Sequence, residues 1–328
     1  MNTIYLIVLF DPDTYIYIGW GLLLLLTTFW GLSWFFTKRR KLMYGVTAAM
    51  LMLWGGFLYG SYIGVNQLEV NHVELTFDDL PEAFDGYKIV QFSDVHIGTL
   101  TGGRHALLER AIDSINAQNA DIVAFTGDMQ NEVPFEIYPD TALLAKIKAK
   151  DGVFSVLGNH DYAMYVDSLD DFEQYTYLGL RTAIDDNLGW NLLLNGRHRI
   201  RRGEQFIVIA GMENDGDGIR FPQNGDISYA LSGIKRDDFV VMLEHDPSAW
   251  KRKILPHSHT QLTLSGHTHG GQLSIFGWSL ANLKYKENSG LYNEGGRYLY
   301  VSNGISGVFP FRLGVPAEIT VITLRKKQ

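Results

Sequence analysis

Two long uncharged segments near the N-terminus constrain this chain most strongly. Residues 14–36 and 42–65 contain no charged side chain, and only Thr37-Lys-Arg-Arg-Lys41 separates them. About 20 apolar residues, rising 1.5 Å each, cross the hydrocarbon core of a bilayer, so each segment is long enough. The sequence therefore predicts a transmembrane helical hairpin, with a membrane anchor over residues 1–65 and a soluble domain over residues 66–328. A pair of buried soluble helices is the alternative. A cleaved signal peptide is disfavoured because no Lys or Arg precedes the first segment.

The charges around these segments predict their orientation. Short loops rich in Lys and Arg stay in the cytoplasm. The only basic cluster near the two segments is Lys38–Lys41, and residues 66–74 carry no cation. We therefore expect a multi-pass membrane protein whose large domain faces the outside, which in a bacterial cell is the periplasm or the exterior. Residues 3–10 are apolar but too short to span, and are interpreted as the stub of a further helix.

Composition excludes several classes of protein. The 328 residues include no cysteine, which excludes a disulfide framework, a zinc ribbon, an iron–sulfur cluster and a thiol nucleophile. Any metal must therefore be bound by His, Asp, Glu, Asn or water. The net charge is −8, and residues 66–328 hold all but two of the 36 acidic side chains. An acidic domain is a poor electrostatic match for nucleic acid, so no nucleic-acid partner is expected.

Residues 66–328 read as an α/β domain. Apolar residues at helical spacing predict an amphipathic helix over residues 104–118. Five short apolar runs are predicted strands that end in polar side chains: residues 87–92, 121–126, 152–157, 239–243 and 261–264. Residues 297–302 and 317–324 are two further predicted strands. In open α/β sheets, sites form beyond the carboxyl ends of the strands, so the five polar ends are expected to converge.

The polar residues after these five strands form an ordered series that predicts a metal centre. In chain order they are Asp94-Val-His96, Gly127-Asp128, Gly158-Asn-His-Asp161, His245 and Gly266-His-Thr-His269. Each motif alone is common in loops, but half of the ten histidines of the chain fall in this series. Adjacent glycines allow the backbone to turn sharply and bring ligands close. The remaining histidines are interpreted as structural or loop residues: His72, His105, His198, His257 and His259.

The series resembles the calcineurin-like metallophosphoesterases, whose pattern D-x-H, G-D, G-N-H-D/E, H and G-H-x-H it meets in full and in order. The resemblance covers about residues 79–324. Four stretches resemble the membrane-tethered or exported bacterial branch of that family: residues 159–162, 245–247, 266–272 and 311–319. The fold that this resemblance implies is two packed mixed β-sheets flanked by helices, here preceded by the transmembrane hairpin.

The resemblance also implies a pair of divalent or mixed-valence ions, such as manganese, iron, zinc or cobalt. One ion would be bound by Asp94, His96, Asp128 and His269. The second would be bound by Asp128, Asn159, His245 and His267, so that Asp128 bridges the two. Two such ions, about 3.5–4 Å apart, clamp a phosphate and share a hydroxide that attacks phosphorus at neutral pH. Nitrogen and oxygen ligands without sulfur suit these metals but do not choose among them.

His160 and Asp161 are expected to be catalytic residues rather than ligands. By resemblance, His160 lies over the substrate, where its imidazolium would protonate the leaving oxygen, an effect worth about 10²–10⁴ in rate. Asp161 would orient the His160 ring, with a cap on the next helix as the alternative. Asn131 stands where purple acid phosphatases carry a Tyr, so no tyrosinate–iron colour is expected.

These motifs predict hydrolysis of a phosphoester or a pyrophosphate without selecting the substrate. A lipid-linked phosphate at the membrane face is one candidate, because little chain separates the second span from the domain. Four tyrosines could line an apolar entrance or pack in the core: Tyr162, Tyr165, Tyr175 and Tyr177. The alternatives are an exported phosphatase or phosphodiesterase with soluble substrates, and an inactive binding or sensor module. Candidate phosphate clamps, or ordinary surface charges, are Arg104, Arg220 and Lys284.

Overall fold

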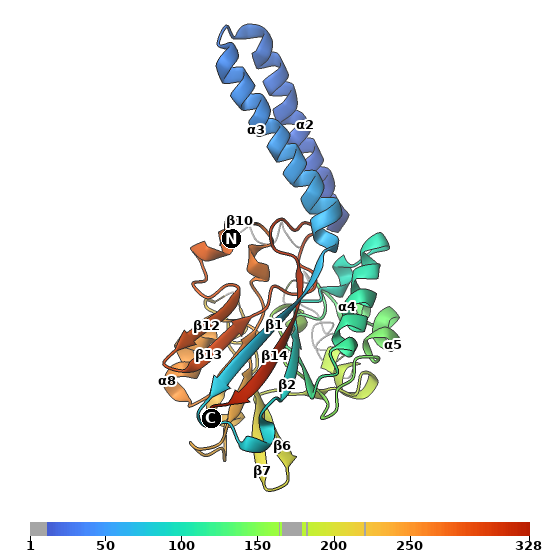
Figure 1. Ribbon diagram of the computed structural model, residues 1–328. Coiled ribbons are helices and arrows are strands. Elements are labelled where there is room, and N and C mark those ends of the chain that lie inside the picture. The colour runs from blue at the N-terminus through green and yellow to red at the C-terminus, as the bar shows by residue number, and fades with distance from the viewer. Residues whose placement is uncertain (1–11, 164, 166–178, 182, 220) are drawn as a thin grey trace.

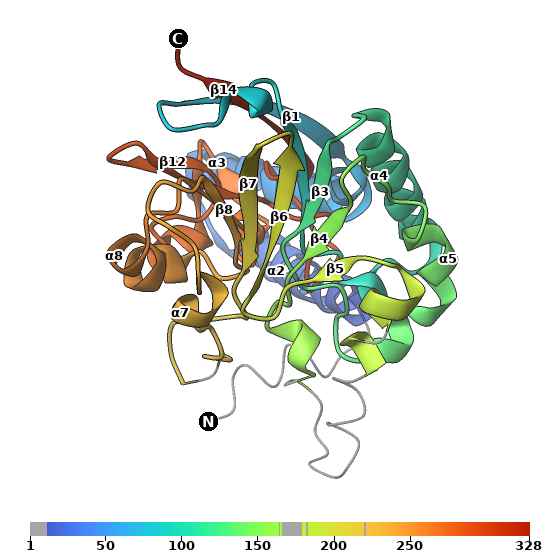
Figure 2. The same cartoon turned by 90° about the horizontal axis from the view of Figure 1, so that it is seen from below.

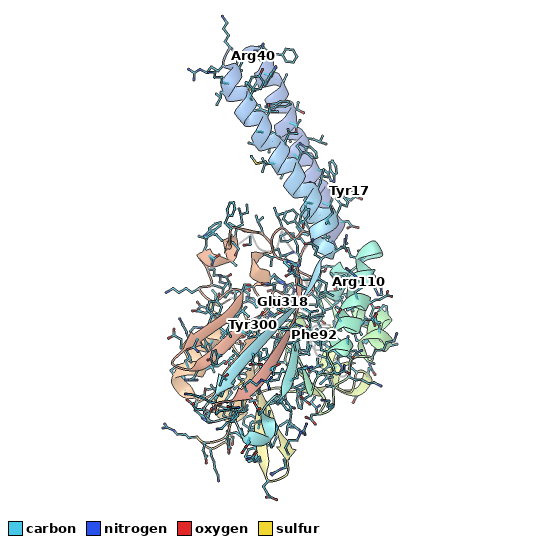
Figure 3. All side chains as sticks on the ribbon, viewed as in Figure 1. Tyr17, Arg40, Phe92, Arg110, Tyr300 and Glu318 are labelled. Atoms are coloured by element: carbon cyan, nitrogen blue, oxygen red, sulfur yellow. The ribbon has the colours of Figure 1, made fainter. Side chains whose placement is uncertain are left out.

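A helical hairpin projects from one end of the domain in the computed structural model, which describes residues 12–163, 165, 179–181, 183–219 and 221–328 (Figure 1). Its helices are α2 (Pro12–Phe36) and α3 (Arg40–Leu58). The second helix continues through a π turn, Tyr59–Ile63, and a 3-10 turn, Gly64–Asn66. Arg40 lies at the far tip of the hairpin (Figure 3). The candidate stub over residues 3–10 lies outside the described residues.

The surface of the hairpin is apolar, and the described residues leave most of it exposed. Both helices are long and apolar enough, by length and composition, to cross a membrane. Phe35 and Phe36 are each 86% exposed, and the buried residues of the two helices are Leu23 and Met43. Helices of a soluble core bury most of their apolar side chains. The alternative of two buried soluble helices therefore does not describe this hairpin.

Two six-stranded sheets form the domain, and both mix parallel and antiparallel strands. The first has the order β1-β14-β2-β3-β4-β5, and the second has the order β12-β13-β9-β8-β7-β6. The strands of the first sheet are β1 (Leu68–Phe77), β2 (Lys88–Phe92), β3 (Ile122–Phe125), β4 (Val153–Ser155), β5 (Asn191–Leu192) and β14 (Ala317–Lys326). Those of the second are β6 (Gly196–Arg202), β7 (Gln205–Gly211), β8 (Val240–Leu243), β9 (Leu262–Ser265), β12 (Gly290–Glu294) and β13 (Arg297–Val301). A separate hairpin joins β10 (Ser274–Ile275) to β11 (Trp278–Ser279).

The two sheets pack face to face, and helices cover their outer faces. One apolar cluster joins them, with Ile89 and Phe154 from the first sheet and Val241 and Leu262 from the second. The helices α4 (His105–Ala117) and α5 (Thr141–Leu144) flank one side of the domain, while α7 (Ile227–Ala230) and α8 (Leu255–His257) flank the other (Figure 2). This layered α/β architecture confirms the predicted fold class.

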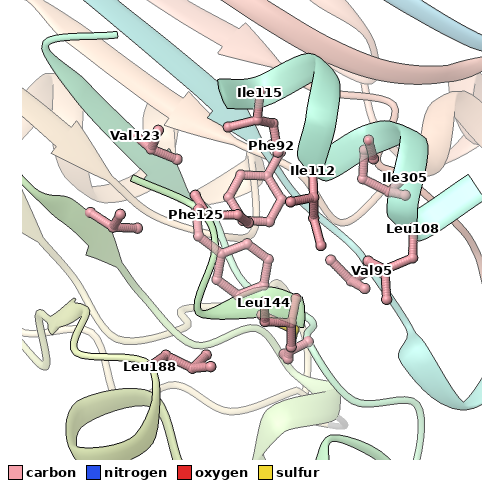
Figure 4. Close-up of a cluster of buried hydrophobic side chains, with 14 of the residues drawn as sticks. Phe92, Val95, Leu108, Ile112, Ile115, Val123, Phe125, Leu144, Leu188 and Ile305 are labelled. Atoms are coloured by element: carbon pink, nitrogen blue, oxygen red, sulfur yellow. The ribbon is translucent and has the colours of Figure 1, made fainter. Parts of the chain in front are cut away.

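The core beneath α4 explains why the central strands read as uninterrupted apolar runs. The rings of Phe92 on β2 and Phe125 on β3 pack 4.9 Å apart. Ile112 and Ile115 of α4 lie over them (Figure 4). Strands buried on both faces lack the alternation of a half-exposed sheet. All seven predicted strands and the predicted helix are present, with ends shifted by at most two residues.

Strand register fixes which end of the domain lies near the hairpin. β1 begins at Leu68, directly after the 3-10 turn, and runs parallel to β14 with Asn71 beside Thr320. β14 runs antiparallel to β2 with Thr320 beside Gln91. The carboxyl end of β2 therefore points back toward the base of the hairpin. Neighbouring strands lie 4.7–4.9 Å apart, so that end lies about 10 Å across the sheet from the start of β1.

Candidate metal centre

The structure brings the predicted ligands together at the carboxyl ends of five strands. They follow β2, β3, β4, β8 and β9, as the sequence predicts. Within each of three overlapping groups, the candidate ligand atoms all lie within 4.8 Å of one another: Asp94 with His96 and His269, His96 with Asp128 and His160, and Asp128 with His245 and His267. Residues from distant parts of the chain therefore share one pocket.

Asp128 occupies the middle of this pocket. Its Oδ2 atom lies 3.1 Å from Nε2 of His245 and 3.5 Å from Nε2 of His96. Oδ1 of Asp94 lies 4.0 Å from Nε2 of His96 and 3.6 Å from Nε2 of His269. One carboxylate thus faces imidazoles from two groups of ligands, which is the arrangement that a bridging ligand requires.

Backbone carbonyls fix the protonation of two of the imidazoles. Nδ1 of His245 lies 2.7 Å from the carbonyl oxygen of Thr126, and Nδ1 of His269 lies 3.1 Å from that of Ser306. A carbonyl only accepts, so each Nδ1 carries the proton. In the neutral ring the lone pair then lies on Nε2, the form in which histidine binds a metal.

Unpartnered buried atoms mark the same pocket. Both ring nitrogens of His96 and Oδ1 of Asn159 are buried without a hydrogen-bond partner among the described residues. Buried polar atoms are normally paired, so such orphans call for an explanation. Nitrogen and oxygen atoms grouped with carboxylates fit metal ions, and the donor set therefore fits the two ions that the sequence predicts.

Backbone strain is concentrated at these residues. Five of them adopt positive φ angles between 40° and 73°: Asp94, His96, Asp128, His267 and His269. A residue with a Cβ rarely adopts this left-handed conformation, and it persists only where surrounding structure enforces it. Strain of this kind is typical of functional sites.

Two glycines make room for the carboxylates. A Cβ at Gly158 would lie 2.1 Å from Oδ1 of Asp128, and one at Gly266 would lie 2.2 Å from Oδ2 of Asp94. No side chain fits at either position without displacing a carboxylate. The glycines of the G-N-H-D and G-H-x-H motifs are therefore required by close approach, as the sequence indicates.

Burial and charge set the protonation states. Burial lowers the pKa of His96 to about 3 and that of His267 to about 4, so both are neutral at pH 7. Burial also lowers the pKa of His245, but the Asp128 carboxylate outweighs it and raises the value to about 10. Burial raises the pKa of Asp94 to about 7. Because ligands bind metals without their protons, His245 would have to release a proton in order to act as a ligand.

His160 and Asp161 do not form the pair that the sequence predicts. Nδ1 of His160 lies 2.6 Å from the carbonyl oxygen of Asn131, so that carbonyl orients the ring. The carboxylate of Asp161 instead accepts backbone N–H groups from two loops, those of Asp128, Met129, Gln130 and Gly158. Asp161 therefore joins the turn after β3 to the turn after β4. A role in orienting the His160 ring, or as a simple helix cap, is replaced by this bridging role.

The other sequence candidates divide into three groups. Arg104 donates to Asp13 of α2 at 2.9 Å. Its guanidinium group is therefore paired with the hairpin and is not placed as a phosphate clamp. Nζ of Lys284 lies 4.2 Å from the ring centroid of Phe221 and 4.8 Å from that of Tyr285, beside the pocket. Arg220, Tyr175 and Tyr177 lie outside the described residues.

The two described tyrosines of the predicted entrance lie beside the centre. The Tyr165 hydroxyl accepts from Nδ2 of Asn159 at 2.7 Å, and its ring packs 4.4 Å from that of His160. The Tyr162 hydroxyl donates to Glu213 at 3.1 Å. Tyr165 therefore covers the site, while Tyr162 links it to the second sheet.

Sequence reasoning missed the supports of the ligands. Tyr285 lies 2.7 Å from Nε2 of His267 through its hydroxyl. Arg312 is 2% exposed and donates to the carbonyls of Asn303, Gly304 and Ser306, the last of which also accepts from His269. Arg312 falls in the stretch 311–319 that resembles the family, which was the one available signal.

Comparisons with known proteins agree with this geometry. Residues 87–271 match the model of the calcineurin-like phosphoesterase family. The metallophosphoesterase YkuE of Bacillus subtilis, described as uncharacterized, is 31% identical over 309 residues, which are 88% of this chain and 98% of that protein. The chain therefore belongs to the calcineurin-like metallophosphoesterases, and its His/Asp metal site makes it a metallophosphoesterase enzyme.

The relatives come from both bacteria and vertebrates. A Danio rerio protein described as a transmembrane protein with a metallophosphoesterase domain is 28% identical over 280 residues, which are 82% of this chain but only 60% of that protein. The similarity therefore defines the family and does not single out the bacterial membrane branch. Among solved structures, TT1561 of Thermus thermophilus is 12% identical with a TM-score of 0.43, covering 67% of this chain and 90% of that one.

Proposed function

We propose that this protein is a two-metal hydrolase of phosphoester or pyrophosphate bonds. One ion would be bound by Asp94, His96, Asp128 and His269, and the other by Asp128, Asn159, His245 and His267. The observation that carries this proposal is the position of Asp128, whose Oδ2 atom faces both His245 and His96. When bound, two such ions polarise a phosphoryl group and lower the pKa of water so that it can act as a nucleophile.

His160 would supply the proton for the leaving oxygen. The Asn131 carbonyl accepts from Nδ1–H of the imidazolium, so the proton on Nε2 is the one available for transfer. A ring nitrogen of His160 lies within 4.8 Å of ligand atoms of His96 and Asp128, so the ring borders the reacting centre. Asp161 would hold the loops that carry Asp128 and Asn159 at a fixed separation.

Several features support action at the membrane surface, with residues 1–65 as the anchor and residues 66–328 as the catalytic domain. The ligand-bearing end of β2 is the end that lies beside the start of β1 and the base of the hairpin. Arg104, ten residues after Asp94, is paired with Asp13 of α2. The basic tip at residues 38–41 favours an outward-facing domain by the positive-inside rule.

A lipid-linked phosphate is the substrate class that this placement favours. A cavity of about 370 Å³ lies between α2 and the loop Phe309–Phe311, lined almost wholly by apolar side chains such as Ile18 and Leu22. Gln272, three residues after His269, donates to the carbonyls of Phe309 and Phe311, both at 2.8 Å. Gln272 therefore links the segment that carries His269 to the loop that lines the apolar cavity, and this link supports a substrate with a hydrocarbon chain.

The test uses the full chain in lipid nanodiscs loaded with Mn²⁺, Fe²⁺, Zn²⁺ or Co²⁺ in turn. We expect hydrolysis of a lipid phosphate or pyrophosphate at least tenfold faster than that of matched water-soluble esters. Equal rates would contradict the lipid assignment, and no hydrolysis of any ester would contradict the phosphoesterase assignment. Asp128→Asn should lose metal and turnover together, whereas the surface control Asp113→Asn should keep both.

A further inference from the structure

The β10–β11 hairpin and the turn after it expose an apolar cluster to solvent. We define the cluster by its large exposed side chains, Ile275, Phe276, Trp278, Leu280 and Leu283. Phe276 is fully exposed and Leu283 is 76% exposed. In the described part of the chain beyond residue 66, ten large hydrophobic residues are exposed. Five of these ten fall within residues 275–283. So dense a patch marks an interaction surface rather than ordinary surface variation.

The local sequence has the character of a membrane interface. No charged residue occurs from Gly270 to Leu283, and Lys284 and Lys286 follow directly. Aromatic residues such as Trp are enriched at the headgroup level of bilayers, and lysines there are attracted to anionic lipids. The order of the segment, apolar first and basic afterwards, fits a loop that enters the interface and returns from it.

The turn between β10 and β11 exposes the ring of Phe276 to solvent, and its backbone conformation there is strained. Ile275 pairs with Trp278, and the two residues between them both have positive φ, 52° at Phe276 and 79° at Gly277. Hairpin turns of this type normally place Asn or Asp at the first position. A phenylalanine in the left-handed region is strained, and the described residues leave this ring fully exposed, so they do not compensate for the strain by burying it. Burial of the ring in lipid would compensate for it.

Contacts attach this cluster to the helical hairpin. Leu273 forms a β-bridge to Leu313, and the backbone N–H of Ser274 donates to the Leu313 carbonyl at 2.8 Å. The preceding residue, Arg312, donates through its backbone N–H to the carbonyl of Gly60 at 3.1 Å, in the π turn that follows α3. β10 therefore lies on the end of the domain from which the hairpin projects (Figure 1).

We propose that residues 273–283 form a second membrane contact, which inserts into the headgroup region of the leaflet that the hairpin enters. This inference rests on the proposed transmembrane placement of α2 and α3. His267 and His269 lie on the segment that leads into β10, so insertion would hold the metal centre against the lipid surface from a second side. The occupant of the apolar cluster is the bilayer itself.

The direct test measures depth in the membrane. Because the chain has no cysteine, Phe276→Cys places a single spin label on the full protein in proteoliposomes of phosphatidylcholine and phosphatidylglycerol. If residue 276 inserts into the membrane, its spin label should be more accessible to oxygen than to a water-soluble nickel chelate. Leu51→Cys on α3 is the reference for a label inside the bilayer. Glu204→Cys is the reference for a label in water, because the β6–β7 turn lies at the opposite end of the domain from the hairpin (Figure 1). A label at Phe276→Cys that matches the aqueous reference overturns the proposal and leaves a protein partner as the occupant.

A second measurement separates this proposal from the proposed function. The double variant Phe276→Ser, Trp278→Ser should keep hydrolysis of a water-soluble ester within twofold of wild type, and should lose at least fivefold on a vesicle-embedded ester. Equal losses on both substrates would contradict the interfacial role. If the wild-type protein hydrolyses neither ester, the proposed function fails, while the spin-label depth still decides whether residues 273–283 insert.

Discussion

Nε2 of His245 lies 3.1 Å from Oδ2 of Asp128, and both side chains are almost completely buried. Burial lowers the pKa of His245, yet the carboxylate outweighs it and raises that pKa from 6.5 to about 10. In the folded protein without metal, the proton is therefore held between the two residues. A metal ion must displace that proton before His245 can act as a ligand.

The metal-stripped protein should therefore lose thermal stability as the pH rises from about 7 to about 10. A histidine whose pKa is raised by folding stabilises fully below its unfolded pKa, and this contribution disappears as the pH passes the folded pKa. Differential scanning calorimetry of EDTA-treated protein should show a lower Tm at pH 9.5 than at pH 7. Added Mn²⁺ should raise the Tm more at pH 9.5. His245→Gln should flatten the slope, and an unchanged slope in that variant would reject the His245–Asp128 explanation.

Gly158→Ala should remove activity without unfolding the domain. The added methyl group would lie 2.1 Å from Oδ1 and 2.6 Å from the backbone nitrogen of Asp128, so the turn that carries Asp128 must shift and the carboxylate must leave its place between the two imidazoles. We expect at least a 100-fold loss of kcat and binding of fewer than two ions, measured by plasma mass spectrometry of the purified protein. Gly103→Ala is the matched control, since a Cβ there has no neighbour within 4 Å. Full metal content in Gly158→Ala would argue against a bridging Asp128.

Asp161→Asn should act on stability as well as rate. The Asp161 carboxylate accepts four backbone N–H groups, and an amide has only one oxygen to replace two. Loss of one or two bonds to a charged acceptor, each worth about 1.5–3 kcal/mol, should lower the free energy of unfolding by about 3 kcal/mol. Urea unfolding of detergent-solubilised protein measures this. A variant as stable as wild type would show that the carboxylate does not join the two loops.

The convergence of the candidate ligands was predictable from the sequence because each of them follows a short apolar run that predicts a strand. Asp, His and Asn after apolar runs converge by the geometry of parallel strands. The orientation of His160 was not predictable, because it depends on the carbonyl of Asn131, and every residue has a carbonyl. The role of Asp161 depends on two loops meeting, which only the tertiary structure specifies.

The edges of the sheets were also hidden from sequence analysis. β1 lies at the edge of its sheet and exposes Glu69, His72 and Glu74, so its apolar pattern is too weak to predict a strand. β6 contains four arginines in seven residues and is exposed along most of its length. Both strands lie at the outer edges of their sheets, whereas the central strands have apolar runs that predict them from the sequence.

His160→Ala should slow hydrolysis by about 10²–10⁴ on an alkyl phosphoester, whose leaving oxygen needs a proton. The loss should be much smaller on a nitrophenyl ester, whose leaving group is stable as an anion. Metal content should stay at the wild-type value, since His160 is proposed as an acid and not a ligand. The control His105→Ala removes a ring that pairs with Asp140 on the surface and should leave both rates unchanged. A loss of equal size on both esters would assign His160 to binding rather than to proton transfer.

Glu204→Cys should react with a membrane-impermeant maleimide on intact cells. Residue 204 lies in the exposed β6–β7 turn, far from the hairpin, and the chain has no other cysteine. The positive-inside rule predicts that the basic loop at the tip of the hairpin stays in the cytoplasm, and in the proposed topology the domain then lies outside. Lys38→Cys, at that tip, should react only after the cells are lysed. The opposite pattern would place the metal centre at the cytoplasmic leaflet, and any lipid phosphate it hydrolyses would then have to be presented from that side.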